Sequence, residues 1–164
     1  MPQIIHHKEL LSREEYYDWL KKLPVGYCPF CDSKNNTVIK SGLLWNLELC
    51  LAPYWRYHFL LVPKRHIKVF SEINPAELTE FFEMVNSTMA TLEAANLKHL
   101  NGEAINRYLF FWRYRGVALD SLYNVFKPDH FHFHIVPEKE HLWDLVADKE
   151  ATKIDLAEVR KIFK

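Results

Sequence analysis

The sequence predicts an α+β fold with a mostly antiparallel sheet. One long stretch, residues 75–96, carries apolar side chains at helical spacing, and shorter stretches typical of strands precede and follow it. No linker, internal repeat or low-complexity tract divides the 164 residues, so we expect one domain with a substantial core. The composition, 49% hydrophobic and 15% aromatic with four glycines, is that of an ordered globular protein.

Charge and composition exclude several classes of protein. Lysine plus arginine equals aspartate plus glutamate, 21 each, which gives no strong signal for nucleic-acid binding or for attraction to anionic lipid. The N-terminus does not resemble a signal peptide, and the longest apolar runs are too short to span a membrane. Three cysteines do not make a disulfide framework. We therefore expect a cytoplasmic protein.

The first elements are a short helix and a group of strands. Ser12 and Glu15 form a capping-box signal that predicts a helix ending before Pro24. This helix belongs to an N-terminal helical extension of about residues 1–26. Strands are expected next at residues 37–40, 45–51 and 57–62.

The strongest predicted element is the central helix. Asn74 is its cap, Pro75 fits the first turn, and Glu77 lies near the positive helix end. The remaining elements are a strand at 105–115, a loop at 116–129, a strand at 130–136 and a terminal helix at 154–163.

The segment DHFHFHIVP, residues 129–137, places three histidines at intervals of two. In a strand His130, His132 and His134 share one face, while the residues between them point into a core. Such a row of imidazoles can bind a metal, perform chemistry or divide these tasks. The alternative is an exposed strand face that is rich in histidine.

Cys28 and Cys31 have the C-x-x-C spacing with which two thiolates hold one metal ion. No histidine follows within the span of a zinc finger, so the other ligands must arrive through the fold, and His66 and His130 are candidates. The alternative is a pair of buried or redox-active thiols.

These residues carry a resemblance to a known family. HFHFHIV resembles the signature of the histidine triad (HIT) superfamily, and YHFLLVPKRHI is similar to that family's strand-and-turn pattern. The cysteine pair is similar to that of zinc-bearing members, and the helix at 75–96 falls where the family has its main helix. The likeness spans roughly residues 27–143.

The resemblance implies a HIT-like fold over residues 1–164, with about five antiparallel strands, one long central helix and short terminal helices. It also implies a nucleotide or nucleotide derivative as substrate, and a homodimer, because many relatives pair through a joint sheet.

The resemblance further implies a mechanism in which His132 attacks the α-phosphate of a nucleotide. His134 would orient His132 or shape the phosphate pocket, and His58 would lie at the same pocket. A structural zinc ion with every position filled, and so without a catalytic task, would be held by Cys28, Cys31, His66 and His130.

The sequence departs from the family pattern at two places. Where relatives carry an aspartate that binds ribose, this chain has Cys50, and Glu48 or Asn46 could serve in another register. The hydroxyl residue that normally precedes the triad is replaced by Lys127, which either neutralises phosphate as a point charge or is a solvated loop residue.

Two functions are consistent with this sequence. The first is a nucleotide phosphohydrolase or nucleotidyl transferase that forms a nucleotidyl-His132 intermediate on substrates such as nucleoside phosphoramidates or dinucleoside polyphosphates. The alternative is a catalytically weak or inactive nucleotide-binding module stabilised by zinc.

Overall fold

The computed structural model describes residues 4–32, 37–112, 119–120, 125–126, 129–138 and 151–164. Its elements are α1 (Arg13–Leu20), β1 (Val38–Ser41), β2 (Trp45–Leu49), β3 (Phe59–Pro63), a 3-10 turn (Phe70–Glu72), α2 (Pro75–Ala95), β4 (Tyr108–Phe111), β5 (Leu119–Asp120), β6 (Val125–Phe126), β7 (Phe133–Pro137) and α3 (Leu156–Ile162).

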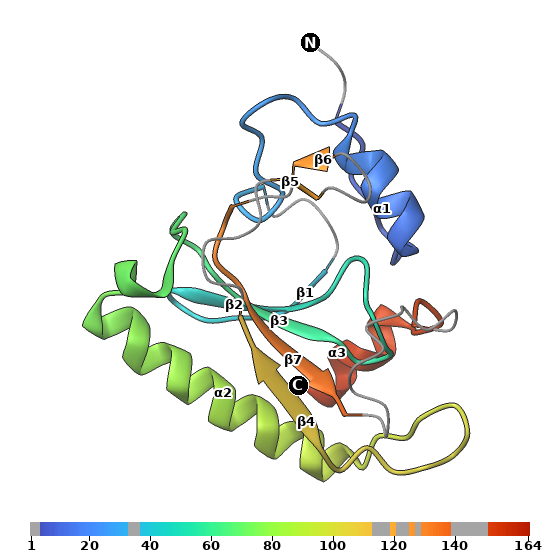
Figure 1. Cartoon of the computed structure of the whole chain (residues 1–164). Coiled ribbons are helices and arrows are strands. Elements are labelled where there is room, and N and C mark those ends of the chain that lie inside the picture. The colour runs from blue at the N-terminus through green and yellow to red at the C-terminus, as the bar shows by residue number, and fades with distance from the viewer. Residues whose placement is uncertain (1–3, 33–36, 113–118, 121–124, 127–128, 139–150) are drawn as a thin grey trace.

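Five of the strands form one antiparallel sheet, as the resemblance implies, and their order is β1-β2-β3-β7-β4 (Figure 1). Along one row of this sheet Glu48 pairs with Leu60, Leu60 with His134, and His134 with Phe111. β5 and β6 pair with each other as a separate two-stranded sheet, which Figure 1 places near α1 and away from α2.

The long helix α2 begins and ends where its flanking residues dictate. The Asn74 side chain accepts a hydrogen bond from the Glu77 backbone N–H, and the Glu77 carboxylate accepts one from the Asn74 N–H. Pro75 occupies the first turn, where a missing N–H costs nothing. The helix ends at Asn96, whose left-handed φ of 47° stops further α-helical bonding.

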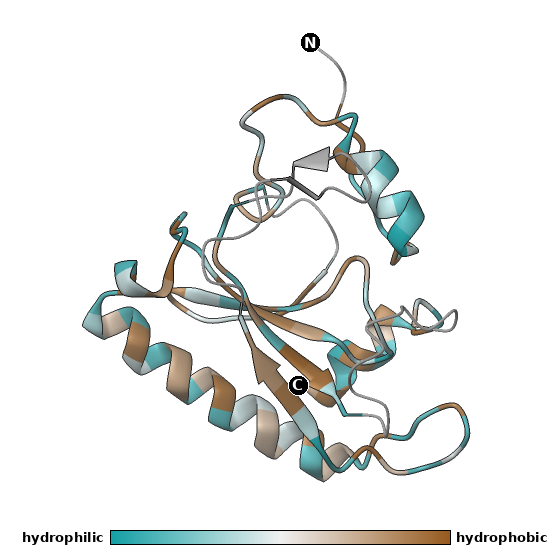
Figure 2. Cartoon of the chain, in the orientation of Figure 1, coloured by the Kyte–Doolittle hydropathy of each residue, from teal (hydrophilic) through white to brown (hydrophobic). Residues whose placement is uncertain are grey.

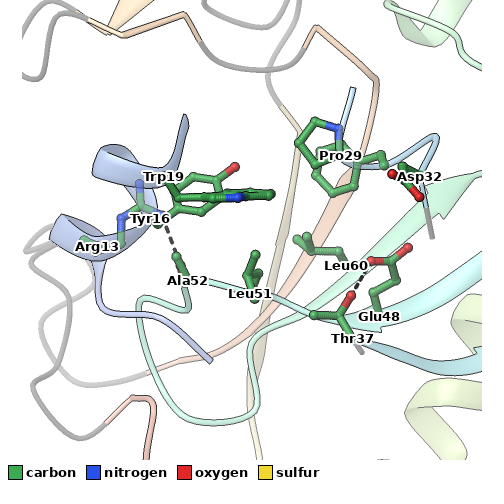
Figure 3. Close-up of a pocket in the computed structure, with 11 residues that line it drawn as sticks. Arg13, Tyr16, Trp19, Pro29, Asp32, Thr37, Glu48, Leu51, Ala52 and Leu60 are labelled. Carbon is green, nitrogen blue, oxygen red and sulfur yellow. Dashed lines mark hydrogen bonds between the residues drawn. The ribbon is translucent and has the colours of Figure 1, made fainter. Parts of the chain in front are cut away.

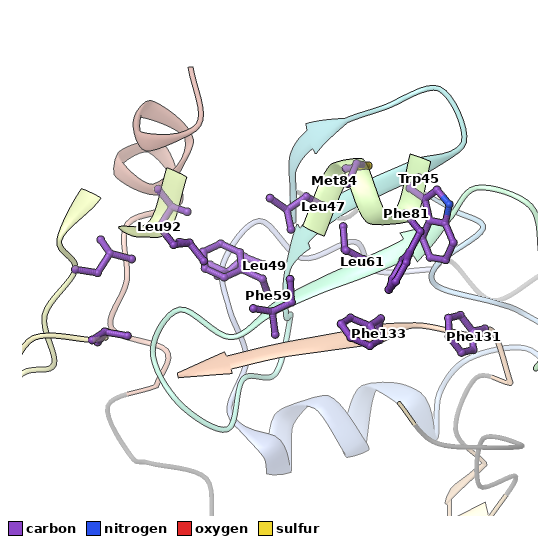
Figure 4. Packing of buried hydrophobic residues seen from close by; sticks show 14 of the residues in the cluster. Trp45, Leu47, Leu49, Phe59, Leu61, Phe81, Met84, Leu92, Phe131 and Phe133 are labelled. Atoms are coloured by element: carbon purple, nitrogen blue, oxygen red, sulfur yellow. The ribbon is translucent and has the colours of Figure 1, made fainter. Parts of the chain in front are cut away.

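The core lies between the sheet and the helices α2 and α3. Alternate residues of the central strands point to this core. Figure 4 shows them on the side of the sheet where Phe81, Met84 and Leu92 of α2 lie. The buried members of this core include Trp45, Leu47, Leu49, Phe59, Leu61, Phe81, Leu92, Phe131, Phe133 and Ile135. Full burial of each such side chain contributes about 1.5–3 kcal/mol, which makes this face the main source of stability.

The second face of the sheet is also covered. Leu60 and Val62 of β3 are buried there beside Cys50, and Phe30 packs on them. The N-terminal extension lies against the loop that follows β2, since the Leu11 N–H donates to Leu51 O at 2.8 Å. Figure 2 shows that apolar residues recur along α2 and through the central strands, in keeping with burial on both sides.

Several boundaries differ from the sequence prediction. The strand expected at 105–115 begins only at Tyr108, and the strands expected at 45–51 and 57–62 are Trp45–Leu49 and Phe59–Pro63. The last sheet strand begins at Phe133 and not at residue 130, because the Phe131 N–H donates to Ile67 O, which lies beyond the end of β3. The stretch 116–129, predicted as a loop, contains the short strands β5 and β6. Within the described residues, no helix combines the length and the apolar character needed to cross a membrane.

Candidate active site and metal cluster

The three histidines of the row lie together on the second face of the sheet. His134 is in β7, and His130 and His132 precede it directly. Phe131, Phe133 and Ile135 point to the core on the opposite face, so the predicted alternation is confirmed. His130 and His134 are buried and His132 is partly exposed.

His130 belongs to a cluster of potential metal ligands. One ligand atom from each of Cys28, Cys31, His66 and His130 lies within 4.8 Å of the others. The Nδ1 of His130 is 3.4 Å from each of the two sulfurs, and the Nδ1 of His66 is 3.1 Å from Cys31 Sγ. Ligands around a tetrahedral zinc ion are separated by about 3.3–3.8 Å, so this donor set fits such an ion.

The contacts around this cluster also suit a metal site. His130 Nε2–H donates to Pro63 O at 2.8 Å, which leaves the lone pair on Nδ1, the nitrogen that faces the sulfurs. His66 Nε2 lies 3.3 Å from Asp129 Oδ1, and Lys68 contacts the same carboxylate at 2.6 Å. Outer contacts of this kind hold metal-binding imidazoles in one orientation and one tautomer.

His132 is fixed by the same segment. Its Nδ1 lies 2.9 Å from the His130 carbonyl oxygen, and a carbonyl only accepts, so Nδ1 carries the hydrogen. The lone pair of the imidazole is therefore on Nε2. The ring of Phe30, which lies between the two cysteines in the chain, is 4.8 Å from the His132 ring.

A chain of hydrogen bonds sets the tautomers of the other two histidines. The Tyr54 N–H donates to His58 Nδ1 at 3.2 Å, so the hydrogen of His58 is on Nε2. That group donates to His134 Nδ1 at 2.9 Å, which puts the hydrogen of His134 on its Nε2. Since the ring centroids of His132 and His134 are 4.7 Å apart, this donor group belongs to a ring next to that of His132.

The electrostatic surroundings keep His58 neutral. Burial, together with the nearby positive charge of Arg13, lowers the pKa of His58 to about 3. A neutral His58 can accept and donate at the same time, as this chain requires. The ring of Tyr54 stacks on it at 5.7 Å, with 20° between the ring planes.

Arg13 of α1 holds the loop that supports His58, a role that no motif in the sequence indicated. Its guanidinium donates to Ala52 O at 3.0 Å, to the Tyr17 hydroxyl at 2.6 Å and to the Tyr54 hydroxyl at 3.2 Å. It also lies 4.4 Å from the centre of the Tyr54 ring, a cation–π distance. The N-terminal extension is thereby connected to the histidine network.

A hollow of about 550 Å³, counted to its open mouth, lies beside this network on the second face of the sheet. Figure 3 shows Tyr16 and Trp19 of α1 on one side of it, and Pro29 on the opposite side. Glu48 lies at its polar end, where it accepts from the Thr37 hydroxyl at 2.9 Å (Figure 3). Burial raises the pKa of Glu48 to about 7.

The structure brings together most of the residues that the sequence singled out. The four metal-ligand candidates form one cluster, and His58, His132 and His134 form a second group that adjoins it. Lys127 lies outside the described residues. At the position of the missing aspartate, Cys50 is buried with its thiol on Ala52 O. Of the two residues considered in its place, Asn46 accepts from the Ser41 hydroxyl and Glu48 from the Thr37 hydroxyl.

Comparison with known proteins gives a consistent family. The HIT domain model matches residues 36–141. An uncharacterised HIT-like protein of Methanocaldococcus jannaschii is 28% identical over 147 residues, which cover 84% of this chain and 98% of that protein.

Two solved structures show the same fold. A zinc-bound histidine triad family protein from Mycobacterium smegmatis matches 82% of this chain and 88% of its own, with a TM-score of 0.52 and 19% identity. An ADP-glucose phosphorylase from Arabidopsis thaliana with bound ADP-glucose matches 91% of this chain and 45% of its own, with a TM-score of 0.57 and 15% identity.

Proposed function

The chain belongs to the HIT domain family, and we propose that it is a nucleotide hydrolase or nucleotidyl transferase that works through a covalent nucleotidyl-His132 intermediate. The substrate is a nucleotide derivative with a leaving group on its α-phosphorus, such as a nucleoside phosphoramidate, a dinucleoside polyphosphate or a nucleotide sugar. The ADP-glucose bound to the similar Arabidopsis thaliana enzyme is a molecule of this class.

The observation that carries the proposal is the tautomer of His132. Its Nδ1–H is bound to the His130 carbonyl, so the nucleophilic lone pair is held on Nε2 before a substrate arrives. An imidazole with a pKa near 6.5 is a competent nucleophile at neutral pH.

The reaction has two steps. In the first, His132 Nε2 forms a bond to the α-phosphorus while the bond from phosphorus to the leaving group breaks, and the leaving group takes a proton from water or a nearby acid. In the second, water or another acceptor attacks the same phosphorus and gives up its proton to solvent or a nearby base, the N–P bond breaks, and the imidazole recovers its lone pair. One difficult displacement is thereby divided into two easier ones.

His134 and His58 support this chemistry as a pair. The hydrogen bond from His58 puts a hydrogen on His134 Nε2, and the rings of His134 and His132 are 4.7 Å apart, which supports donation from His134 to a phosphoryl oxygen, where negative charge grows during attack. His58 holds that tautomer through its own Nε2–H, and the Tyr54 backbone holds His58 in turn. We therefore assign His134 to phosphate binding and His58 to the positioning of His134.

We propose that the cluster of cysteines and histidines holds a structural zinc ion. The ligands would be Cys28, Cys31, His66 and His130. A four-coordinate ion of this kind supplies folding energy and has no open position for substrate. By fixing His130, the cluster fixes the carbonyl oxygen that sets the tautomer of His132.

The test is the loss of chemistry in His132→Asn. We expect the variant to fold normally, to turn over no nucleoside phosphoramidate, dinucleoside polyphosphate or nucleotide sugar, and to form no nucleotidyl adduct by intact-protein mass spectrometry. His99→Asn, a partly exposed histidine in the loop after α2, is the matched control and should keep full activity. An unchanged rate in His132→Asn would refute the assignment.

A second function is favoured by the absence of the ribose-binding aspartate. Cys50 stands at that position, buried, with its thiol on a backbone carbonyl. If this change abolishes turnover, the protein is a zinc-stabilised nucleotide-binding module. Nucleotide binding by the wild type without turnover or adduct would support this second function.

A further inference from the structure

We infer that the hollow beside His132 is a slot for a flat base whose edge carries adjacent hydrogen-bond donors, as guanine does, and that Glu48 reads this edge. The inference rests on the proposed function, because it names the class of nucleotide that the site takes. The walls of the slot come partly from α1 and from the turn that carries Cys28 and Cys31. Both segments precede the part of the chain that the HIT domain model matches.

The walls of the hollow suit a planar ring. Tyr16 and Trp19 of α1 form one side, and Pro29 lies across from them (Figure 3). Phe30, the next residue in the chain, also lines the hollow. Leu60 of β3 contributes to its apolar lining. Aromatic side chains bind flat rings by stacking, and ligand sites are commonly apolar hollows with a few polar groups.

The slot lies at a distance from His132 that suits the base of a nucleotide whose phosphorus is at that histidine. Phe30 lines the hollow and also contacts the ring of His132 at 4.8 Å, so the slot adjoins the nucleophile. Glu48 is two strands from His134, since Glu48 pairs with Leu60 and Leu60 with His134. Two strand spacings are about 10 Å, which is comparable with the reach of a nucleotide from its phosphorus to the outer edge of its base.

The polar end of the slot presents acceptors. Glu48 is 7% exposed, and among the described residues the Thr37 hydroxyl is its one hydrogen-bond donor. Asp32 adds a second carboxylate to the lining. An ionised carboxylate only accepts, and a buried one with few donors is costly, so a ligand that brings donors relieves that cost.

Among the common bases, guanine fits this edge best. Its N1–H and its exocyclic amino group are adjacent donors that can bind both oxygens of one carboxylate. Adenine presents an acceptor nitrogen beside its amino group, so one carboxylate oxygen would face a lone pair. A site built to receive donors discriminates strongly against a ligand that lacks them, because its buried acceptors stay unpaired.

The test compares the equilibrium binding of GMP, IMP and AMP to the wild-type protein by calorimetry at pH 8, above the Glu48 pKa of about 7, so that this carboxylate is ionised. We expect GMP to bind about tenfold or more tightly than AMP. IMP, which keeps N1–H but lacks the amino group, should lie between them. Equal affinities for the three nucleotides would overturn the inference, and this comparison needs no variant that could fail to fold.

Two variants assign the preference to one carboxylate. Glu48→Gln should bring GMP affinity to within about threefold of AMP affinity, whereas Glu83→Gln, on the exposed face of α2, should keep the wild-type preference. Retention of the full preference in a folded Glu48→Gln protein would overturn the role of Glu48.

Turnover separates this inference from the proposed function. Hydrolysis of guanosine and adenosine phosphoramidates at equal rates, with equal affinities for GMP and AMP, would refute the base slot and leave the enzyme assignment intact. Selective GMP binding without turnover or adduct would support the slot and refute the enzyme assignment.

Discussion

The chemistry of single residues in this site is set by backbone groups. A backbone carbonyl takes the hydrogen of His132 on Nδ1, while a backbone N–H forces the hydrogen of His58 onto Nε2. Two histidines of the same site thus have opposite tautomers. The result is one ring with an Nε2 lone pair beside another, His134, with an Nε2–H donor.

We predict that Glu48→Gln stabilises the protein at alkaline pH. Burial raises the pKa of Glu48 from 4.5 to about 7, so the folded state binds a proton more tightly than the unfolded state does. Stability from this group is complete below pH 4.5 and is lost as the pH rises to about 7. Denaturant titrations at pH 8 should show an increase of up to about 3 kcal/mol in the free energy of unfolding.

The same titrations at pH 4 should show little change, because the wild-type carboxyl is then protonated in the folded state and largely protonated in the unfolded one. Glu83→Gln is the matched control and should leave stability nearly unchanged at both pH values. A loss of stability in Glu48→Gln at pH 8 would mean that the wild-type carboxylate has donors sufficient to hold it ionised.

His58 gives stability the opposite pH dependence to that given by Glu48. Burial lowers its pKa from 6.5 to about 3, so between these pH values His58 is protonated in the unfolded state and neutral in the folded state. Its contribution is present above pH 6.5 and is lost as the pH falls toward 3. We predict that His58→Gln weakens the dependence of unfolding free energy on pH between 6 and 4 by about 1.4 kcal/mol per pH unit.

Denaturant titrations across that range measure the slope. At pH 7.5 the variant should be less stable than the wild type, since it loses the hydrogen bonds to Tyr54 and His134. An unchanged slope would show that His58 titrates in the folded protein as it does in the unfolded chain.

At the scale of elements, one side chain connects the helix α1 to the histidine network. Arg13 joins α1 to the loop that carries Tyr54, and Tyr54 holds His58. We predict that Arg13→Met lowers the free energy of unfolding by about 1–3 kcal/mol, because two tyrosine hydroxyls and a carbonyl lose a charged partner. Denaturant unfolding measures this change.

Lys21→Met is the control, because Lys21 at the end of the same helix makes an exposed ion pair with Asp18. Such a pair contributes about 0–1 kcal/mol, so the variant should unfold nearly as the wild type does. Equal effects of the two substitutions would argue against a clamp at Arg13.

The sequence was sufficient to predict the elements that repeat a pattern. The apolar repeat of α2, its caps at Asn74 and Pro75, and the alternation around His130 to His134 are local signals, and each was confirmed. The start of β7 was predicted three residues early, because pairing depends on Ile67, which no local pattern marks. The two-residue strands β5 and β6 are too short to show a period.

For the candidate site, the sequence identified the residues whose chemistry is distinctive and missed those whose role depends on position. The cysteine pair and the histidine row were recognised by type and spacing. Arg13 contacts Ala52 and Tyr54 across about forty positions, with no repeating signature. Glu48 was considered from its register, but its burial depends on how the N-terminal extension covers the sheet.

At the scale of the whole molecule, the metal cluster joins segments that are far apart in the sequence. Its donors come from the turn at residues 28–31, from the segment after β3 and from the segment before β7. Closing such long loops costs conformational entropy, which metal binding would offset in the folded state alone. The same cluster also fixes the carbonyl that orients His132.

We therefore predict that the purified protein contains about one equivalent of zinc by elemental analysis, and that Cys28→Ser loses it. Burial raises the pKa of the Cys28 thiol to about 12, so metal binding displaces a proton there and weakens at low pH. The melting temperature should fall by about 2–4 °C for each kcal/mol of lost binding energy.

Cys50→Ala, which removes the thiol outside the cluster, should retain the metal. The prediction fails if the purified wild type contains no metal, or if a chelator leaves its melting temperature unchanged. Either result would show that the thiols and imidazoles pack without an ion, and that no metal is needed to fix the carbonyl group of His130.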